Sequence, residues 1–327
     1  MTLVDELLRS DEPAIRWKVR ARVKGEDPAS PAMRRLAGQV RSSATVQALL
    51  SGLARLAPHT YAKWQGGHWV LQTLADLGYP AGDKAIVPIR DSVQASWLQP
   101  RFFQETLSRS PKQVHVAVPL IDGRYRRCGS QQGGALLAVV RLGLANDGSA
   151  TLAERLRHWQ WPDGGWNCDR DPAAATSSVY ETLLPMRGLH AFGIATGDQA
   201  SVVAARAAAE VLLSRRLLFR RSNGQLIRPE WVKLHYPLYW HYDVLGALKG
   251  LAELGQLADP RAQEGLDLLQ SKELPSGGWP AEATYYRRSA ELGANVDFVS
   301  WGGISARRRN DWVTADALAV LTAAGRL

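Results

Sequence analysis

The residues best suited to bind a metal ion are two cysteines and a histidine. Cys128 and Cys168 are the only cysteines of the chain, and each comes shortly before a segment that we expect to be helical. With His241 they offer two thiolates and one imidazole, ligands that suit four-coordinate zinc. The carboxylates that could complete such a site are those of Asp169, Asp171 and Asp243. Alternatively, the cysteines are small packing residues and the histidine is a buried side chain with a backbone partner.

A second set of residues could transfer protons. Asp243 follows His241 closely enough in sequence to orient its imidazole. Tyr180 and Glu181 open another predicted helix and form a second candidate proton-handling pair. The alternative role for Asp243 is that of a helix cap or of one member of a salt bridge.

Asp169 and Asp171 flank Arg170 and form a further candidate pair of catalytic carboxylates. The guanidinium between them would stabilise both as anions, and it would therefore weaken them as proton donors. We therefore do not expect the pair to act as a strong acid, and a helix cap or a salt bridge is the alternative role for each carboxylate.

A third set consists of aromatic and polar residues that stand at the predicted starts of helices or in long loops. Aromatic ring faces suit an apolar or cationic group of a bound substrate. The candidates for substrate binding are His68, Trp69, Gln132, Tyr239, Trp240, Tyr242, Trp301 and Trp312. Aromatic side chains at helical spacing also serve as ordinary core, and we expect only some of these to face a ligand.

The composition excludes several classes of protein. The 327 residues are 46% hydrophobic, so the chain can bury a large core. No apolar run is long enough to cross a membrane, and the first residues lack the pattern of an export signal. The two cysteines argue against a disulfide framework and for a reducing, cytoplasmic location.

The formal net charge of +9 comes from scattered basic residues and a few short arginine clusters. No nucleic-acid-binding motif accompanies these clusters, and we do not expect nucleic acid as a partner. Arg126 with Arg127, and the run from Arg307 to Arg309, could instead bind an anionic head group of a small substrate. Solvated surface is the alternative for both clusters.

Periodic apolar residues and turn signals predict an all-helical chain. Three helices are expected at the N-terminus: residues 2–24, broken near Pro13, then a helix to residue 40, then residues 42–56, stopped by Pro58. Apolar helices are expected over residues 67–77, 131–142, 177–192, 240–254 and 311–324. Amphipathic helices are expected over residues 84–97, 151–159, 199–218 and 260–269. Long loops should cover residues 100–127, 219–239 and 281–310.

Two turns share a sequence pattern. Gln160, Gly164 and Trp166 follow the order Gln-x-x-x-Gly-x-Trp, and Gln270, Gly277 and Trp279 form a second copy with a longer gap. With the alternating helices, this pattern resembles the repeat of the terpenoid cyclase and protein prenyltransferase superfamily. The resemblance implies a squalene-cyclase-like α/α toroid of inner and outer helices over residues 45–327, with residues 1–44 as an N-terminal helical extension.

The resemblance also implies a function. It suggests a biosynthetic enzyme that acts on a small hydrophobic or isoprenoid-like substrate in a central aromatic cavity. Protein prenyltransferases hold zinc at the cavity mouth through Asp, Cys and His, and His241 is the best match to that histidine. The family's Asp-x-Cys falls here near Thr176, which cannot replace it, and the acidic Asp-x-Asp-Asp motif of the cyclases is absent. The competing hypothesis is a non-catalytic toroid that binds a peptide, lipid or nucleic acid through its arginine clusters.

Overall fold

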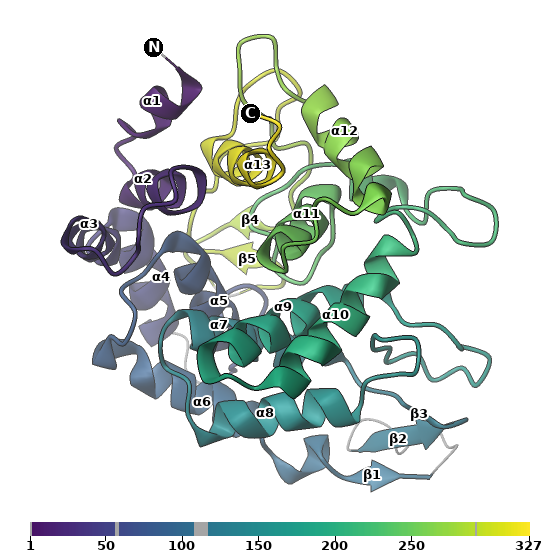
Figure 1. The fold of residues 1–327 in the computed structure, drawn as a ribbon. Coiled ribbons are helices and arrows are strands. Elements are labelled where there is room, and N and C mark those ends of the chain that lie inside the picture. Colours follow the sequence, from purple (N-terminus) through teal and green to yellow (C-terminus); the bar gives the residue numbers. More distant parts are fainter. Residues whose placement is uncertain (1, 56–58, 108–116, 292) are drawn as a thin grey trace. The chain divides into compact units, whose positions relative to one another are not determined.

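The computed structural model describes residues 2–55, 59–107, 117–291 and 293–327 (Figure 1). Helices dominate these residues, and the strands are short. The prediction of a mainly helical chain is therefore confirmed at this coarser level. The predicted end of one helix at residue 56 and its stop at Pro58 lie outside the described residues.

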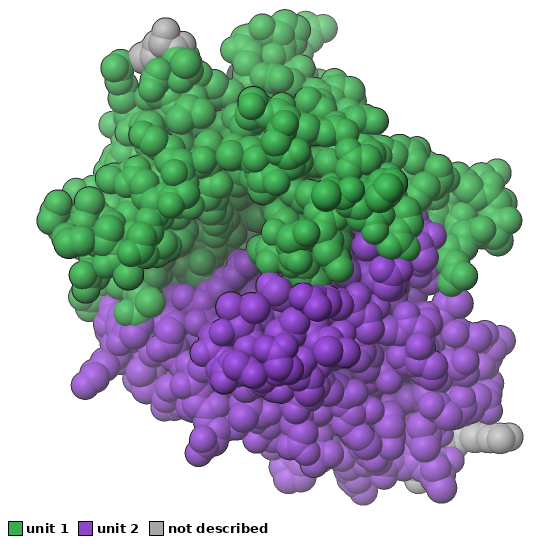
Figure 2. All heavy atoms as spheres, in the orientation of Figure 1, with its two compact units in different colours: residues 1–81, 216–239, 243–327 green, residues 82–215, 240–242 purple. Residues whose placement is uncertain are grey.

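The chain divides into two compact units (Figure 2). Unit 1 consists of residues 1–81, 216–239 and 243–327, and unit 2 of residues 82–215 and 240–242. Unit 1 therefore combines the two ends of the chain, whereas unit 2 is almost continuous in sequence. The expected division into residues 1–44 and 45–327 stays a prediction.

The N-terminal part of unit 1 contains five helical segments of regular α-type. They are α1 (Leu3–Leu7), α2 (Pro13–Lys18), α3 (Pro31–Arg41), α4 (Ala44–Arg55) and α5 (Gly67–Leu77), and a π-helical turn η1 (Val19–Val23) continues α2. Proline at the first position of α2 and α3 fits helix starts, since its missing N–H is not needed there. The predicted break near Pro13 and the predicted bounds 67–77 are confirmed.

The C-terminal part of unit 1 carries the remaining elements of that unit. These are η5 (Pro229–Val232), α11 (Val244–Glu253), η6 (Pro260–Ala262), α12 (Gln263–Ser271), the parallel strand pair β4 (Arg287–Arg288) and β5 (Val296–Asp297), and α13 (Asp311–Ala323). Helix α11 starts four residues later than expected because Asp243 is its N-cap, with Oδ1 accepting a hydrogen bond from the Gly246 N–H at 2.7 Å.

Unit 2 is built around four longer helices. They are α7 (Gly129–Arg141), α8 (Asp147–His158), α9 (Val179–Thr196) and α10 (Gln199–Leu213), preceded by η2 (Lys84–Ile86), α6 (Val87–Trp97) and η3 (Pro100–Phe102). Helix α10 ends before the predicted residue 218, because Arg216 and Leu217 adopt left-handed backbone conformations with φ of 42° and 66°.

The segment expected to be a loop over residues 100–127 holds strands as well. Strand β2 (Val118–Ile121) pairs in parallel with β1 (Glu105–Thr106) and antiparallel with β3 (Arg124–Tyr125). The prediction of an unstructured loop is wrong for these residues. The three strands are too short to show a clear alternating pattern in the sequence.

Helix α9 packs against both α7 and α10. Its contact with α7 is close because glycines face backbone there: a Cβ on Gly133 would lie 2.4 Å from the Pro185 nitrogen, and one on Gly188 would lie 2.6 Å from the Gly133 carbonyl oxygen. A side chain at either position would force the helices apart. This contact determines how the starts of α7 and α9 lie beside each other.

Candidate metal centre

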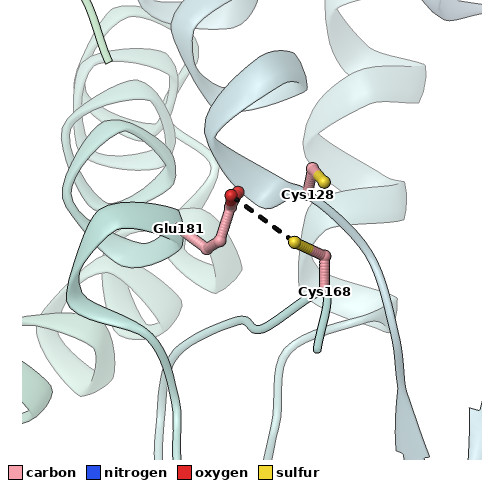
Figure 3. Close-up of side chains that lie close together, drawn as sticks. All are labelled: Cys128, Cys168 and Glu181. Carbon is pink, nitrogen blue, oxygen red and sulfur yellow. Dashed lines mark hydrogen bonds between the residues drawn. The ribbon is translucent and has the colours of Figure 1, made fainter. Parts of the chain in front are cut away.

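Cys128, Cys168 and Glu181 meet in unit 2 (Figure 3). Cys128 is the N-cap residue of α7, Glu181 lies in the first turn of α9, and Cys168 lies in the non-helical segment before α9. Their sulfur and carboxylate atoms all lie within 4.8 Å of one another. The Cys168 thiol points at Oε1 of Glu181, at a distance of 3.7 Å.

Backbone pairing brings the two cysteine segments together. Arg126 and Asn167 form a parallel bridge, and the Arg127 N–H donates to the Asn167 carbonyl at 3.1 Å. The residues that follow these two segments are the cysteines, so the pairing places the thiols side by side. Neither cysteine forms a disulfide, and both are partly exposed.

The carboxylate of Glu181 is held in one orientation. Its Oε2 accepts hydrogen bonds from the Ser130 N–H at 3.0 Å and from the Ser130 hydroxyl at 2.7 Å. Oε1 is thereby left directed toward the thiol of Cys168. Ligating carboxylates in metal sites are commonly oriented by such secondary hydrogen bonds.

Burial disfavours the charged forms of the Glu181 carboxyl and the Cys128 thiol when no cation is bound. Burial raises the pKa of the Glu181 carboxyl, although the hydrogen bonds from Ser130 act in the opposite direction. A hydrogen bond with Cys168 and then burial raise the pKa of the Cys128 thiol. No ion pair joins Glu181 to a lysine or arginine in the described part of the chain.

The structure thus brings together both predicted cysteines but adds Glu181 where we expected His241. His241 is not a member of this group. Its ring stacks on Trp240 with a centroid separation of 4.6 Å, and Trp240 packs edge-on against Tyr180 at 5.3 Å. Tyr180 is the residue before Glu181 on α9. One member of the aromatic pair Tyr180–Trp240 is therefore next in sequence to a residue of the cysteine group.

The contacts of Asp243 that the structure gives are with His235 and with the start of α11, not with His241. Its Oδ2 accepts a hydrogen bond from the His235 N–H at 3.0 Å and lies 2.9 Å from His235 Nδ1, and both side chains are buried. Capping of α11 by Oδ1 directs the other carboxylate oxygen toward this segment. His235 lies in a predicted loop, and no local pattern singled it out.

Asp169 and Asp171 are exposed and shape their own loop. Oδ1 of Asp169 accepts from the Asp171 N–H at 3.1 Å, and Oδ1 of Asp171 accepts from the Ala173 N–H at 2.9 Å. Such turns are a common role of aspartate in loops. Neither carboxylate belongs to the cysteine group.

Most residues expected to bind substrate are deeply buried. The members with almost no exposed surface are His68, Trp69, Gln132, Tyr242 and Trp301, and Tyr239 is buried too. Trp312 is partly exposed and stacks on Tyr236 at 5.2 Å. Burial of this extent is typical of core packing, the alternative considered for these aromatic residues.

Trp301 and Tyr239 both donate hydrogen bonds to Asp297, a residue that the sequence did not single out. The indole Nε1 of Trp301 lies 2.7 Å from Oδ2 of Asp297, and the Tyr239 hydroxyl donates to the same oxygen. Burial raises the pKa of the Asp297 carboxyl, and these two hydrogen bonds oppose that effect. Asp297 is therefore a buried carboxyl with defined partners in unit 1.

A larger buried group of charges in unit 1, which we call the charge network, was not predicted either. It consists of Lys18, Arg22, Asp76, Lys249 and Asp316. Lys18 lies 2.5 Å from Asp76 and 3.0 Å from Asp316, and Lys249 lies 2.5 Å from Asp316. The network joins α2, η1, α5, α11 and α13, so only the folded chain could reveal it.

Three of the five arginines proposed for an anionic head group contact other side chains of the protein. Arg126 and Arg127 are buried, and their guanidinium groups lie over Trp161 at 4.6 Å and over Phe102 at 4.5 Å. Arg309 forms ion pairs with Glu6 at 2.7 Å and Asp311 at 2.8 Å, whereas Arg307 and Arg308 are exposed. Solvated surface is thus a poor description of Arg126 and Arg127.

Comparison with known proteins does not assign this chain to a family. No protein-family model matches it, and no curated protein is similar enough to count as a relative. A search of the described helices for a segment of sufficient length and apolarity to cross a membrane finds none.

Proposed function

We propose that Cys128, Cys168 and Glu181 bind a zinc ion and that the protein is a zinc-dependent enzyme. The observation that carries this proposal is the convergence of three ligand atoms within 4.8 Å of one another, from three separate segments. Two thiolates with one carboxylate suit zinc, which accepts sulfur and oxygen ligands in tetrahedral geometry. Three protein ligands leave a fourth position for water or substrate, as is typical of catalytic zinc sites.

The residues around the group fit this role. Ser130 fixes one oxygen of Glu181 and leaves the other directed toward Cys168. Cys128 and Glu181 stand at the N-terminal ends of α7 and α9, where the helix dipoles favour the anionic forms that bind a metal. Zinc in this position would polarise a substrate oxygen or lower the pKa of a bound water or thiol.

The aromatic pair beside the centre supports a substrate with an apolar part. Tyr180 and Trp240 are both partly exposed, and their ring centroids lie 5.3 Å apart. An apolar or isoprenoid-like group could pack on these rings while its reactive end approaches Glu181. His241, stacked on Trp240, is the candidate proton carrier in this arrangement.

The wider proposal is a biosynthetic enzyme of the terpenoid cyclase and prenyltransferase type, with an α/α toroid. Matching hydrogen bonds at the two turns that share the Gln, Gly and Trp pattern support a structural repeat. The Trp166 indole donates to the Leu156 carbonyl at 2.9 Å, and the Trp279 indole donates to the Leu269 carbonyl at 2.7 Å. At both turns the backbone N–H of the tryptophan bonds to a threonine hydroxyl of the next helix.

Metal analysis of the purified full-length protein tests the zinc proposal. We expect about one zinc per chain in the wild type. Cys168→Ala and Glu181→Gln should each lose the metal because each removes one of the three ligands. His241→Ala is the matched control and should keep it. Circular dichroism would verify that every variant is folded.

Two results would overturn the proposal. One is a wild-type protein that takes up no zinc from a zinc-containing buffer. The other is a loss of metal in Cys168→Ala and His241→Ala but not in Glu181→Gln, which would return the site to the ligand set predicted from the sequence.

A further inference from the structure

The two thiols of the candidate metal centre have a second chemical capability. Cys128 and Cys168 are the only cysteines among the 327 residues, yet their sulfur atoms lie within 4.8 Å of each other. Both cysteines are partly exposed, so the packing of a buried core does not account for their position next to each other. We propose that Cys128 and Cys168 form a reversible disulfide whose formation excludes metal from the centre.

The backbone around the cysteines is compatible with this bond. The parallel bridge between Arg126 and Asn167 keeps the two segments at the spacing of adjacent strands, about 4.8 Å. Cys128 follows Arg126 by two residues and Cys168 follows Asn167 by one, so the cysteines lie on these neighbouring segments, offset by one residue. The sulfur atoms must close by at most about 3 Å to reach the bond length of about 2.05 Å.

The local structure around Cys168 allows its sulfur atom to move toward that of Cys128. Cys168 lies outside any helix, and within the described residues its backbone N–H and carbonyl form no hydrogen bond. Its thiol contacts Oε1 of Glu181 at 3.7 Å and the Cys128 thiol, and a thiol is only a weak hydrogen-bond donor. Cys128, in contrast, is fixed at the start of α7, where its carbonyl accepts from the Gln131 N–H at 3.3 Å. Rotation of the Cys168 side chain would bring the sulfur atoms together.

The reaction requires an oxidant, and hydrogen peroxide is the class of reagent that fits. One S–H bond breaks in each cysteine and one S–S bond forms, so the two thiols lose two protons and two electrons. Peroxide accepts both and becomes two molecules of water. A dithiol such as dithiothreitol reverses the step by thiol–disulfide exchange. A bound zinc ion would leave as the dication, with its oxidation state unchanged.

Release of metal rests on the zinc proposal, whereas the disulfide does not. In a disulfide neither sulfur remains a thiolate, and Glu181 alone is a poor zinc ligand set. Peroxide should therefore switch the protein between a thiol form that binds zinc and a disulfide form that does not.

The experiment is peroxide treatment of the full-length protein, followed by titration of free thiols after denaturation and by intact mass measurement. We expect both thiols to disappear, the mass to fall by two hydrogen atoms, and dithiothreitol to restore both values. Cys168→Ser should show no such mass loss within one chain. Glu181→Gln keeps both thiols and should still form the disulfide, although it should not bind zinc.

Three outcomes would overturn the proposal: thiols that survive peroxide, oxidation to sulfinic acid without a disulfide, or a bond between two chains seen as a dimer on a non-reducing gel. Zinc content before treatment separates the two proposals. A protein that contains no zinc but forms the internal disulfide would contradict the zinc proposal alone. A protein that contains zinc but whose two thiols never form a disulfide would contradict the disulfide proposal alone.

Discussion

The charge network of unit 1 and the cysteine centre of unit 2 are both groups of buried or partly buried ionisable side chains, and they differ in how their charges are balanced. Burial alone would raise the pKa of Asp76, but Lys18, Lys249 and Arg22 together hold it well below 3.8. In the cysteine centre burial raises the pKa of Glu181, and no basic residue reverses the effect. The first group contains several cations of its own, whereas in the second the charge of Arg127 offsets burial only in part.

This difference has a physical consequence. A buried carboxylate is costly unless a positive charge or several hydrogen bonds compensate for its lost hydration. The network meets this requirement within the chain. In the cysteine centre the two hydrogen bonds from Ser130 and the charge of Arg127 do not fully offset burial, so the pKa of Glu181 stays raised. A cation from outside would complete the compensation, which is the behaviour expected of a metal site. Three predictions test this comparison.

The largest effect should come from removing one carboxylate of the network. Asp316→Ala leaves Lys18 and Lys249 without an anion that lies at 3.0 Å and 2.5 Å. Breaking a buried ion pair on one side costs about 3–5 kcal/mol, and we expect a loss of that size in the free energy of unfolding, measured in urea.

A surface pair provides the control for Asp316→Ala. Asp267 lies 2.6 Å from Arg326 and its side chain is 69% exposed. Asp267→Ala should cost about 1 kcal/mol or less because exposed ion pairs contribute little. Equal losses in the two variants would show that the network is not a special stabilising group.

An intermediate effect is expected when zinc is added. At a free zinc concentration of a hundred times its dissociation constant, the folded state should gain about 2.7 kcal/mol. Glu181→Gln should lose most of this gain, since it removes a ligand while conserving shape. Asp169→Asn changes an exposed residue next to Cys168, and this variant should keep the gain. A zinc effect on stability that is the same in both variants would contradict the assignment of Glu181 as ligand.

The smallest effect concerns acid. The pKa values of Asp76 and Asp316 are lowered in the folded protein, so below pH 3.8 the unfolded chain binds more protons than the folded one. Stability should therefore fall as the pH decreases through this range, by at most about 1.4 kcal/mol per pH unit for each group. Urea unfolding of the wild type from about pH 5 to about pH 3 measures the slope. A slope unchanged in Asp316→Asn would rule out the contribution of that carboxylate.

Local signals in the sequence predicted the elements well where side chains act on neighbouring backbone. The bounds of α5 and the break near Pro13 follow from such signals. In the Gln-x-x-x-Gly-x-Trp turn, Gln160 Nε2 donates a hydrogen bond to the Gly164 carbonyl, four residues along the chain, at 2.6 Å. The second copy differs: Gln270 accepts a hydrogen bond from Arg326 at 2.5 Å, a contact across many residues that no local pattern predicts.

The sequence predicted the residue types of the candidate site but not its complete ligand set. The sequence by itself marked Cys128 and Cys168 as a metal-binding pair and Glu181 as a reactive residue, because few residue types perform such chemistry. Only the tertiary structure decided that Glu181, rather than His241, joins the cysteines. Likewise it alone assigned Asp243 to His235 and assembled the charge network from five elements. The sequence gives the identity of each side chain. A ligand set also depends on the distances between segments that are far apart in the sequence, and packing such as that of α7 on α9 determines those distances.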